Sequence, residues 1–190
     1  MSPFMELINA ADASLTTIEA HLDSLAFADR VAAVRHLSGG AQKRLFKLCE
    51  RAFPLSLDEL VPPALSDGQE VIFLGSNSLP LFTTLEKHLA RKLGTVIGFN
   101  RQPFDWLTGP GYFTATPSKD RPGVLFDYTK VPERGLDNWP EARSNAQGFS
   151  RLVFMNLHDY CRRVSKDVVI AQATRLGKAM DTYFVMARAA

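Results

Sequence analysis

The spacing of apolar residues changes at residues 61–68, and this change limits the possible fold more than any other feature. Before it, apolar side chains recur every three or four positions, as in Leu15, Ile18 and Leu22, which is the spacing of one helix face. After it, apolar segments are short and rich in β-branched and aromatic residues, which favours strands. The stretch between them reads VPPALSDG and fits neither pattern. The sequence therefore predicts an α+β fold in which helices come first.

The break also suggests a domain division. We expect an N-terminal helical segment, residues 1–61, and an antiparallel β-rich domain with one or two helices, residues 70–190. A chain of 190 residues is long enough for two such units or for one compact domain, and both remain open. In either case the helices are expected to pack on a curved antiparallel sheet or a partly closed β-barrel.

Three helices are predicted before the break. Their apolar stripes lie in residues 15–25, 31–37 and 41–52. Ser38 stands where the third helix would begin and is a plausible N-cap. Ser56 and Glu59 have the spacing of a capping box that opens one further short turn. The first third of the chain should therefore be helical almost throughout.

Strands are predicted beyond the break at residues 70–74, 95–99, 111–116, 124–129, 168–173 and 183–188, with a long loop over residues 130–148. The last two strands are joined through Leu176-Gly177-Lys178. Residues 79–92 favour a helix that begins at Pro80, because Leu81, Leu85 and Leu89 repeat every four positions; a strand is the rival interpretation. Residues 149–164 fit a helix or a strand equally well.

Composition and charge exclude several classes of protein. With 46% hydrophobic and 22% charged residues, the chain is typical of a soluble globular protein. Residues 1–69 hold six basic and nine acidic side chains, whereas residues 70–190 hold sixteen and eleven, and the basic residues are scattered. A nucleic-acid partner would require a denser basic stripe. No apolar run approaches the roughly 18 residues of a membrane span, and the N-terminus lacks the pattern of a signal peptide. We expect a cytoplasmic protein with no nucleic-acid or membrane partner.

Cofactor and metal motifs are missing from the sequence. The four histidines are widely spaced, so no metal site is predicted. No glycine-rich phosphate loop or nucleotide fingerprint is present, and no cofactor is expected. Cys49 and Cys161 have no paired spacing, and we expect both to be reduced core thiols without a disulfide between them.

The hairpin predicted over residues 111–129 holds the first candidate site residues. Strand alternation places Phe126 and Tyr128 on one face and Asp127 on the other. If the face of Asp127 is the inside of the sheet, its carboxylate needs a partner, because a buried unpaired charge is too costly. The candidates for that partner are Arg162, Arg163 and Arg188.

The stretch LHDYCRR, residues 157–163, gathers the other candidates. On a helix, Asp159 and Arg162 or Arg163 would form an ordinary surface ion pair. Alternatively, the two arginines form a clamp for a carboxylate or phosphate, since the guanidinium group binds such anions with two hydrogen bonds. His158 and Cys161 have the spacing of a base and a nucleophile on a helix, which is a weaker alternative.

The C-terminal stretch also resembles a known family. Asp159-Tyr160-Cys161-Arg162-Arg163-Val164, then Gly177-Lys178, then Tyr183 to Arg188, is similar to the closing strands of lipocalin-like (calycin-type) barrels. Those barrels end on a charged aromatic strand, a Gly-Lys turn and an aromatic strand that finishes in arginine. The resemblance implies a small barrel with an interior cavity that binds a ligand.

Three functions follow as hypotheses, and the oligomeric state is left open. The leading one is a binding domain for a small, mostly apolar ligand with an acidic head group, held in a Phe/Tyr-lined pocket. Whether the protein also catalyses a reaction is left open, and we favour a protein without enzymatic activity. The expected ligand-binding residues are Tyr112, Asp127, Tyr128, Tyr160, Arg162, Arg163 and Trp106. The second is an enzyme in which Asp127 or Asp159 is the general base and Tyr112 or Tyr128 the acid. The third is a protein-interaction module that uses the acidic N-terminal helices.

Overall fold

The N-terminal quarter of the chain is helical, and serines mark where several helices begin. The Ser38 hydroxyl accepts a hydrogen bond from a backbone amide of the first turn, and Ser56 forms the predicted capping box with Glu59. The three predicted helices are confirmed within the described residues, and Ala52, the last position of the third apolar stripe, lies outside them. An additional first helix has only Phe4 and Ile8 buried, too few to show a period. The elements are α1 (Pro3–Asn9), α2 (Leu15–Ser24), α3 (Phe27–Arg35), α4 (Gly39–Leu48), the 3-10 turn η1 (Cys49–Arg51) and α5 (Leu57–Leu60).

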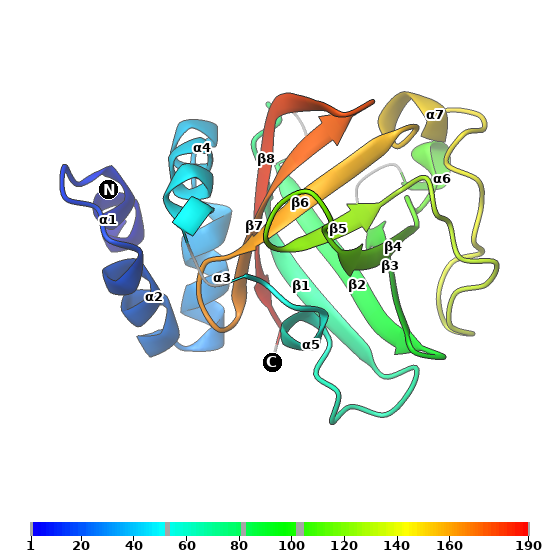
Figure 1. Ribbon diagram of the computed structural model, residues 1–190, viewed down its shortest axis with the longest axis horizontal. Helices are drawn as coiled ribbons and strands as arrows, with labels where there is room; N and C mark the ends of the chain where they lie inside the picture. The colour runs from blue at the N-terminus through cyan, green and yellow to red at the C-terminus, as the bar shows by residue number, and fades with distance from the viewer. Residues whose placement is uncertain (1, 52–53, 81–82, 102–104, 190) are drawn as a thin grey trace.

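The rest of the chain is built on eight antiparallel strands that close into a barrel (Figure 1). Each strand pairs with the next in the sequence, and β8 pairs with β1, so the sheet has no free edge. The computed structural model describes residues 2–51, 54–80, 83–101 and 105–189. The strands are β1 (Glu70–Asn77), β2 (Thr84–Lys92), β3 (Thr95–Arg101), β4 (Phe113–Pro117), β5 (Val124–Asp127), β6 (Leu157–Arg163), β7 (Val168–Arg175) and β8 (Lys178–Arg188). The α+β class is therefore confirmed, and the barrel is fully closed.

A glycine allows the barrel to close. Gly75 lies where β1 pairs with β8, opposite Met186. A Cβ atom at this position would lie 1.9 Å from the carbonyl oxygen of Val185. The two backbones approach too closely for any side chain, which is a known reason for glycine inside a strand.

The predicted helix over residues 80–92 is wrong. Thr84–Lys92 forms β2, paired with β1 on one side and β3 on the other; Leu81 and Phe82 lie outside the described residues. A spacing of four positions is a multiple of the strand period of two, so Leu85 and Leu89 share a face in a strand as well as in a helix. The ambiguous stretch 149–164 divides into the short helix α7 (Ser150–Val153) and strand β6.

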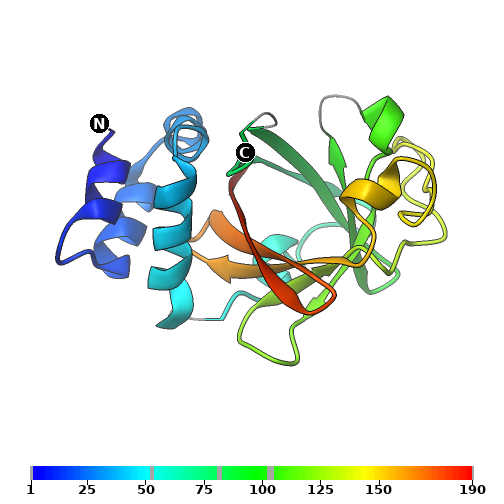
Figure 2. The same ribbon diagram turned by 90° about the horizontal axis from the view of Figure 1, so that it is seen from above.

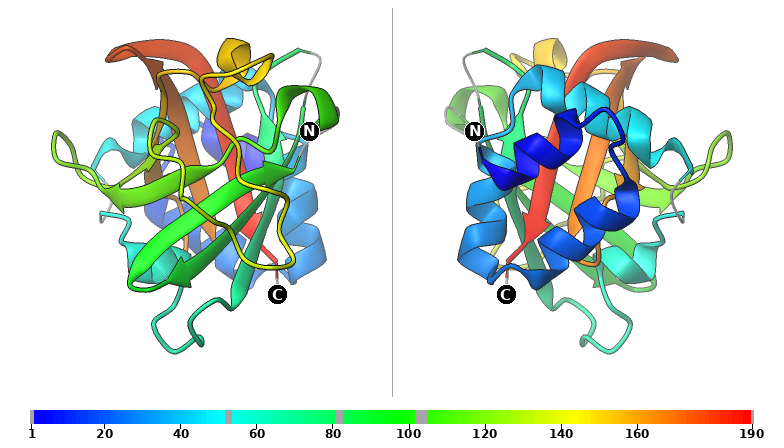
Figure 3. Two further views of the ribbon diagram at one scale, coloured as in Figure 1. Left: turned by 90° about the vertical axis from the view of Figure 1, so that its right-hand side faces the viewer. Right: turned by 90° about the vertical axis from the view of Figure 1, so that its left-hand side faces the viewer.

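The described residues form three apolar clusters, one inside the barrel and two outside it, the smaller outer one around Phe99, Tyr112 and Trp139. Side chains on the inner faces of the strands fill the part of the barrel next to α5. Residues 55–61, which include α5, close this end of the barrel through Leu55, Leu60 and Val61. The outer faces of β7 and β8 pack against α3 and α4, on which α1 and α2 rest (Figure 3). The helices thus cover one outer side of the barrel. The division into residues 1–61 and 70–190 stays a prediction.

The up-and-down topology separates the connections between the two ends of the barrel. The β1–β2, β3–β4 and β7–β8 connections lie at the end away from α5, which we call the mouth end (Figure 2), and the β5–β6 connection carries α7 there. The central part of the β5–β6 connection reaches the other end, where the Lys92 ammonium group donates to the carbonyl oxygens of Arg134 and Gly135. The β2–β3, β4–β5 and β6–β7 turns lie at the other, closed end. The short helices α6 (Asp105–Thr108) and α7 belong to mouth-end connections.

Candidate functional site

A cavity of about 440 Å³ opens at the mouth end of the barrel. Its volume lies within the range of about 300–1,000 Å³ that is usual for small-molecule sites. Most of its wall is apolar or aromatic, and it is formed by the inner faces of several strands and by α7. The apolar wall includes Leu85, Phe154, Leu157, Ala173, Met180 and Phe184.

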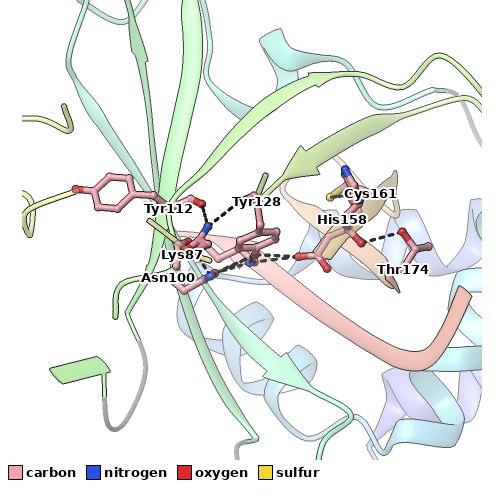
Figure 4. Close-up of polar contacts among 10 residues, drawn as sticks. Lys87, Asn100, Tyr112, Tyr128, His158, Cys161 and Thr174 are labelled. Atoms are coloured by element: carbon pink, nitrogen blue, oxygen red, sulfur yellow. Dashed lines mark hydrogen bonds and ion pairs between the residues drawn. The ribbon is translucent and has the colours of Figure 1, made fainter. Parts of the chain in front are cut away.

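One side of the cavity carries a buried polar network (Figure 4). The Lys87 ammonium group donates to the Asn100 amide oxygen at 2.5 Å and to the Tyr128 hydroxyl at 2.7 Å. The Tyr128 hydroxyl donates to the Asp159 carboxylate at 2.9 Å. Asn100 is fixed in turn, because its amide nitrogen donates to the Gly111 carbonyl oxygen at 3.1 Å. All four side chains line the cavity, and each is almost completely buried.

The charged pair in this network is compensated from several directions. The Lys87 nitrogen lies 3.7 Å from Asp159 and 4.6–5.6 Å from the centres of four aromatic rings, those of Phe113, Phe126, Tyr128 and Phe184. Aromatic faces attract cations, and the attraction grows when the cation is desolvated. The network therefore holds one positive and one negative charge away from water.

Burial changes the acid–base properties of this network. It lowers the pKa of Lys87, although the nearby Asp159 carboxylate opposes the change. It raises the pKa of Asp159 more than Lys87 and Tyr128 lower it. Burial and the Asp159 charge together hold the pKa of Tyr128 well above its ordinary value. Each shift favours the neutral form, as expected where desolvation dominates.

A third charged residue, Arg175, stands at the cavity wall on the last residue of β7. Its guanidinium group donates to the carbonyl oxygens of Leu152 and Val153 in α7, at 3.3 and 2.6 Å. Its Nε atom is buried and has no hydrogen-bond partner among the described residues. With Lys87 and Asp159, Arg175 gives the charged residues of the cavity wall a formal net charge of +1.

Among the residues predicted from sequence, the structure brings Tyr128 and Asp159 together at the cavity. Asp127 is buried but faces outward from the barrel, on the face opposite Phe126. The expected pairing of Asp127 with Arg162, Arg163 or Arg188 is wrong. The carboxylate accepts hydrogen bonds from Thr129, and it lies 3.2 Å from both Lys130 and His158.

The other predicted ligand-binding residues do not line the cavity. Tyr112 points away from the network (Figure 4) and packs outside the barrel on Phe99 and Trp139. Trp106, in α6, is 77% exposed. The remaining three predicted residues lie in β6 and contact residues outside the cavity. Tyr160 stacks under Arg121, Arg162 lies over the Phe46 ring and bonds to the Phe46 carbonyl, and Arg163 pairs with Glu19 and Glu59.

The helical interpretations of residues 157–163 are wrong for one physical reason. In a strand, neighbouring side chains point to opposite faces, so Asp159 and Cys161 face the interior whereas His158 and Arg162 face outward. Asp159 and Arg162 therefore form no ion pair, and His158 does not meet Cys161. Of the phenylalanines expected to line a pocket, Phe154 and Phe184 line the cavity, while Phe73, Phe113 and Phe126 fill the barrel core next to it.

Lys87, Asn100 and Arg175 were not predicted from the sequence as site residues. Lys87 carried a usable signal, because period-two alternation places it on the same face as Leu85 and Leu89. A lysine between two leucines on one strand face indicates a buried ammonium group. In a helix over these residues, Lys87 would instead point away from the face of Leu85 and Leu89.

Outside this site the described residues offer little further chemistry. Over residues 2–51, 54–80, 83–101 and 105–189, no group of three or more His, Cys, Asp or Glu side chains is placed to hold a metal ion. None of the helices in that part of the chain has the length and apolar character needed to cross a membrane. Comparison with known proteins finds no matching family model, no similar curated protein and no similar solved structure.

Proposed function

We propose that the protein binds a small, mostly apolar molecule with an acidic head group inside the barrel. The observation that carries this proposal is the cavity of about 440 Å³, whose largely apolar wall carries a few fixed polar groups. Burying polar groups in an apolar wall costs free energy of desolvation unless the groups are paired with one another. Such a network also orients a ligand, which an apolar wall alone does not do.

Charge indicates where the acidic head binds. A carboxylate placed at Lys87 would also face Asp159, and two negative charges would then share one buried cation. Beside Arg175 the same carboxylate meets a guanidinium group with N–H donors left over. The acid therefore binds at the mouth, and the apolar part extends inward. Lys87, Asn100 and Asp159 are then available to hydrogen-bond a neutral polar group at the far end of the ligand.

An eight-stranded up-and-down barrel around a ligand cavity is the architecture of lipocalins. The closing strands β6 to β8 are the ones that resemble that family. The architecture supports a lipocalin-like relationship as a proposal. Fold alone does not identify a ligand, so the functional argument depends on the cavity itself.

Binding of the fluorescent fatty acid cis-parinaric acid and of its methyl ester tests this function. The wild type should bind both, and the acid more tightly. Ala173→Phe should block both because it fills the cavity, whereas Ala11→Phe, on an exposed loop before α2, should change neither. Arg175→Met should remove only the preference for the acid. The proposal fails if Ala173→Phe binds the probe as well as the wild type does.

One observation favours a catalytic role for the same site. Asp159 and Tyr128 are hydrogen-bonded at 2.9 Å on the cavity wall, and burial raises the pKa of Asp159, as in many general bases. Asp127 has no such role, because it faces away from the cavity. If the site is catalytic, it should accelerate deuterium exchange at the carbon next to the carbonyl of cyclohexanone in D₂O. Asp159→Asn should abolish the acceleration and Asp120→Asn should not; exchange at the buffer rate in the wild type would rule this role out.

The interaction-module hypothesis gains no such support. The apolar faces of α1 to α4 are buried against one another and against the barrel. Among the described residues, none of the large exposed hydrophobic side chains belongs to these helices.

A further inference from the structure

Exposed apolar side chains gather at the mouth end of the barrel. Every connection at this end presents at least one: β1–β2, β3–β4, β5–β6 and β7–β8. In the described residues the closed end presents only Leu93, in the β2–β3 turn. The mouth-end residues are Leu79, Trp106, Leu107, Phe149, Leu152, Met155 and Leu176, which we call the apolar rim.

The rim is continuous with the cavity. Leu79 and Leu152 belong both to the rim and to the cavity wall. The helices α6 and α7, which carry Trp106, Leu107 and Leu152, are tied together, because the Ser150 hydroxyl in α7 donates to the Thr108 carbonyl oxygen in α6 at 2.5 Å. The apolar rim therefore surrounds the opening of the cavity, which is where a ligand would enter. Such surfaces on soluble proteins usually mark a binding face.

Charge narrows the identity of the partner. The described elements of the rim, α6, α7 and the β7–β8 turn from Arg175 to Lys178, carry three basic side chains, Arg151, Arg175 and Lys178, and one acidic side chain, Asp105. A mixed apolar and basic surface fits the interface of a bilayer that contains anionic lipids, where apolar side chains enter the headgroup boundary and basic ones meet phosphates. A mostly apolar ligand is also more concentrated in a bilayer than in water.

We infer that the mouth end docks on the surface of anionic lipid bilayers, and that the barrel exchanges its ligand with the bilayer there. This inference rests on the proposed function. Docking of this kind needs no spanning segment, but it departs from the expectation, drawn from the sequence, that the protein has no membrane partner. The acidic head, held by Arg175 at the mouth, would then lie at the level of the lipid headgroups.

The chain contains a matched pair of sites for testing the rim. Leu93-Gly94 and Leu176-Gly177 are both two-residue hairpin turns with positive φ angles, 49° and 79° in one and 51° and 76° in the other. Both leucines are highly exposed, at 87% and 73%, but they lie at opposite ends of the barrel. Asparagine is favoured at this turn position, so Leu93→Asn and Leu176→Asn should both fold.

Vesicle binding is measured with vesicles of phosphatidylcholine alone and of phosphatidylcholine mixed with phosphatidylglycerol. The wild type should bind the mixed vesicles more tightly, with a blue shift in Trp106 emission that is absent in Trp106→Phe. Leu176→Asn and Phe149→Ser should each weaken binding by about fivefold, whereas Leu93→Asn should leave it unchanged. Arg151→Gln should reduce the preference for the anionic vesicles.

Several results overturn the inference. These are no vesicle binding by the wild type, an equal loss in the two turn variants, or a dimer in solution that Leu176→Asn alone dissociates, which would assign the rim to a second copy of the chain. The cis-parinaric acid assay without vesicles separates the two proposals. Leu176 does not line the cavity, so Leu176→Asn should still bind the probe. Probe binding without vesicle binding refutes only the docking inference, and vesicle binding without probe binding supports the rim but refutes the cavity proposal.

Discussion

Replacing Lys87 with methionine is the most direct test of the buried network. Methionine keeps the length of the side chain and packs well against aromatic rings, and four such rings surround this position. The substitution removes the cation and leaves the Asp159 carboxylate buried with only the Tyr128 hydroxyl as a described hydrogen-bond donor. Breaking a buried ion pair from one side costs about 3–5 kcal/mol, and we expect Lys87→Met to destabilise the protein by that amount at pH 7.

The companion variants separate charge from packing. Asp159→Asn keeps an oxygen that accepts from Tyr128, and Lys87 keeps its rings and its bond to Asn100, so we expect a smaller cost of about 1–3 kcal/mol. The double variant Lys87→Met/Asp159→Asn contains no buried charge at this site. It should be more stable than the sum of the two single effects predicts, by about 1–3 kcal/mol.

The effect of Lys87→Met should depend on pH with a defined sign. Burial raises the Asp159 pKa in the folded protein, so folding binds a proton between the ordinary carboxyl pKa and the raised one, and stability falls as pH rises through that window. Without Lys87 the Asp159 pKa rises further and the window widens. The loss of stability caused by Lys87→Met should therefore be largest at neutral pH and should shrink towards about pH 4, where Asp159 is protonated.

Urea unfolding followed by circular dichroism at both pH values measures these differences. Lys119→Met, on the exposed β4–β5 turn, is the control and should change stability by no more than about 0.5 kcal/mol. The reasoning is refuted if Lys87→Met unfolds with the wild type at pH 7, or if its cost is the same at both pH values.

Three further predictions concern other parts of the fold. Asp127→Ala should cost about 1–3 kcal/mol in urea melts, against about 0.5 or less for Asp120→Ala in the β4–β5 turn. Burial acts to raise the Asp127 pKa, but the hydrogen bonds from Thr129 and Lys130 and the His158 charge outweigh it and lower the pKa, so its contribution should be lost as pH falls below about 4; equal melts would contradict this. Cys49 and Cys161 are both buried and free, and burial raises the pKa of Cys49 to about 12, so a thiol reagent should label both quickly only after unfolding, and fast labelling of the native protein would show the burial to be wrong. Gly75→Ala should destabilise the protein strongly because its Cβ would meet the Val185 backbone at 1.9 Å, whereas Gly40→Ala, in α4 with nothing within 4 Å of its Cβ, should stabilise it by about 0.5–1 kcal/mol; thermal melts that rank the two variants the other way would refute this account of barrel closure.

Local interactions determined much of this fold, and for that reason it could be predicted. Three- or four-residue apolar spacing set the helices α2 to α4, serine side chains cap α4 and α5, and each of these signals acts within a few residues. Most strands were predicted because β-branched and aromatic runs carry a period of two. The hairpin over residues 111–129 even gave the correct pairing of faces, with Phe126 and Tyr128 together and Asp127 opposite them.

Only the tertiary structure decided which face lies inside the barrel and which strands meet across it. Residues 80–92 and 157–163 were misread or left ambiguous because their spacing satisfies two periods. Both segments hold a member of the candidate site, Lys87 and Asp159. These residues are 72 positions apart in the sequence, and their side chains come within 3.7 Å only because β2 and β6 face each other across the closed barrel. Ring closure is a property of all eight strands together, so no local pattern in the sequence records it.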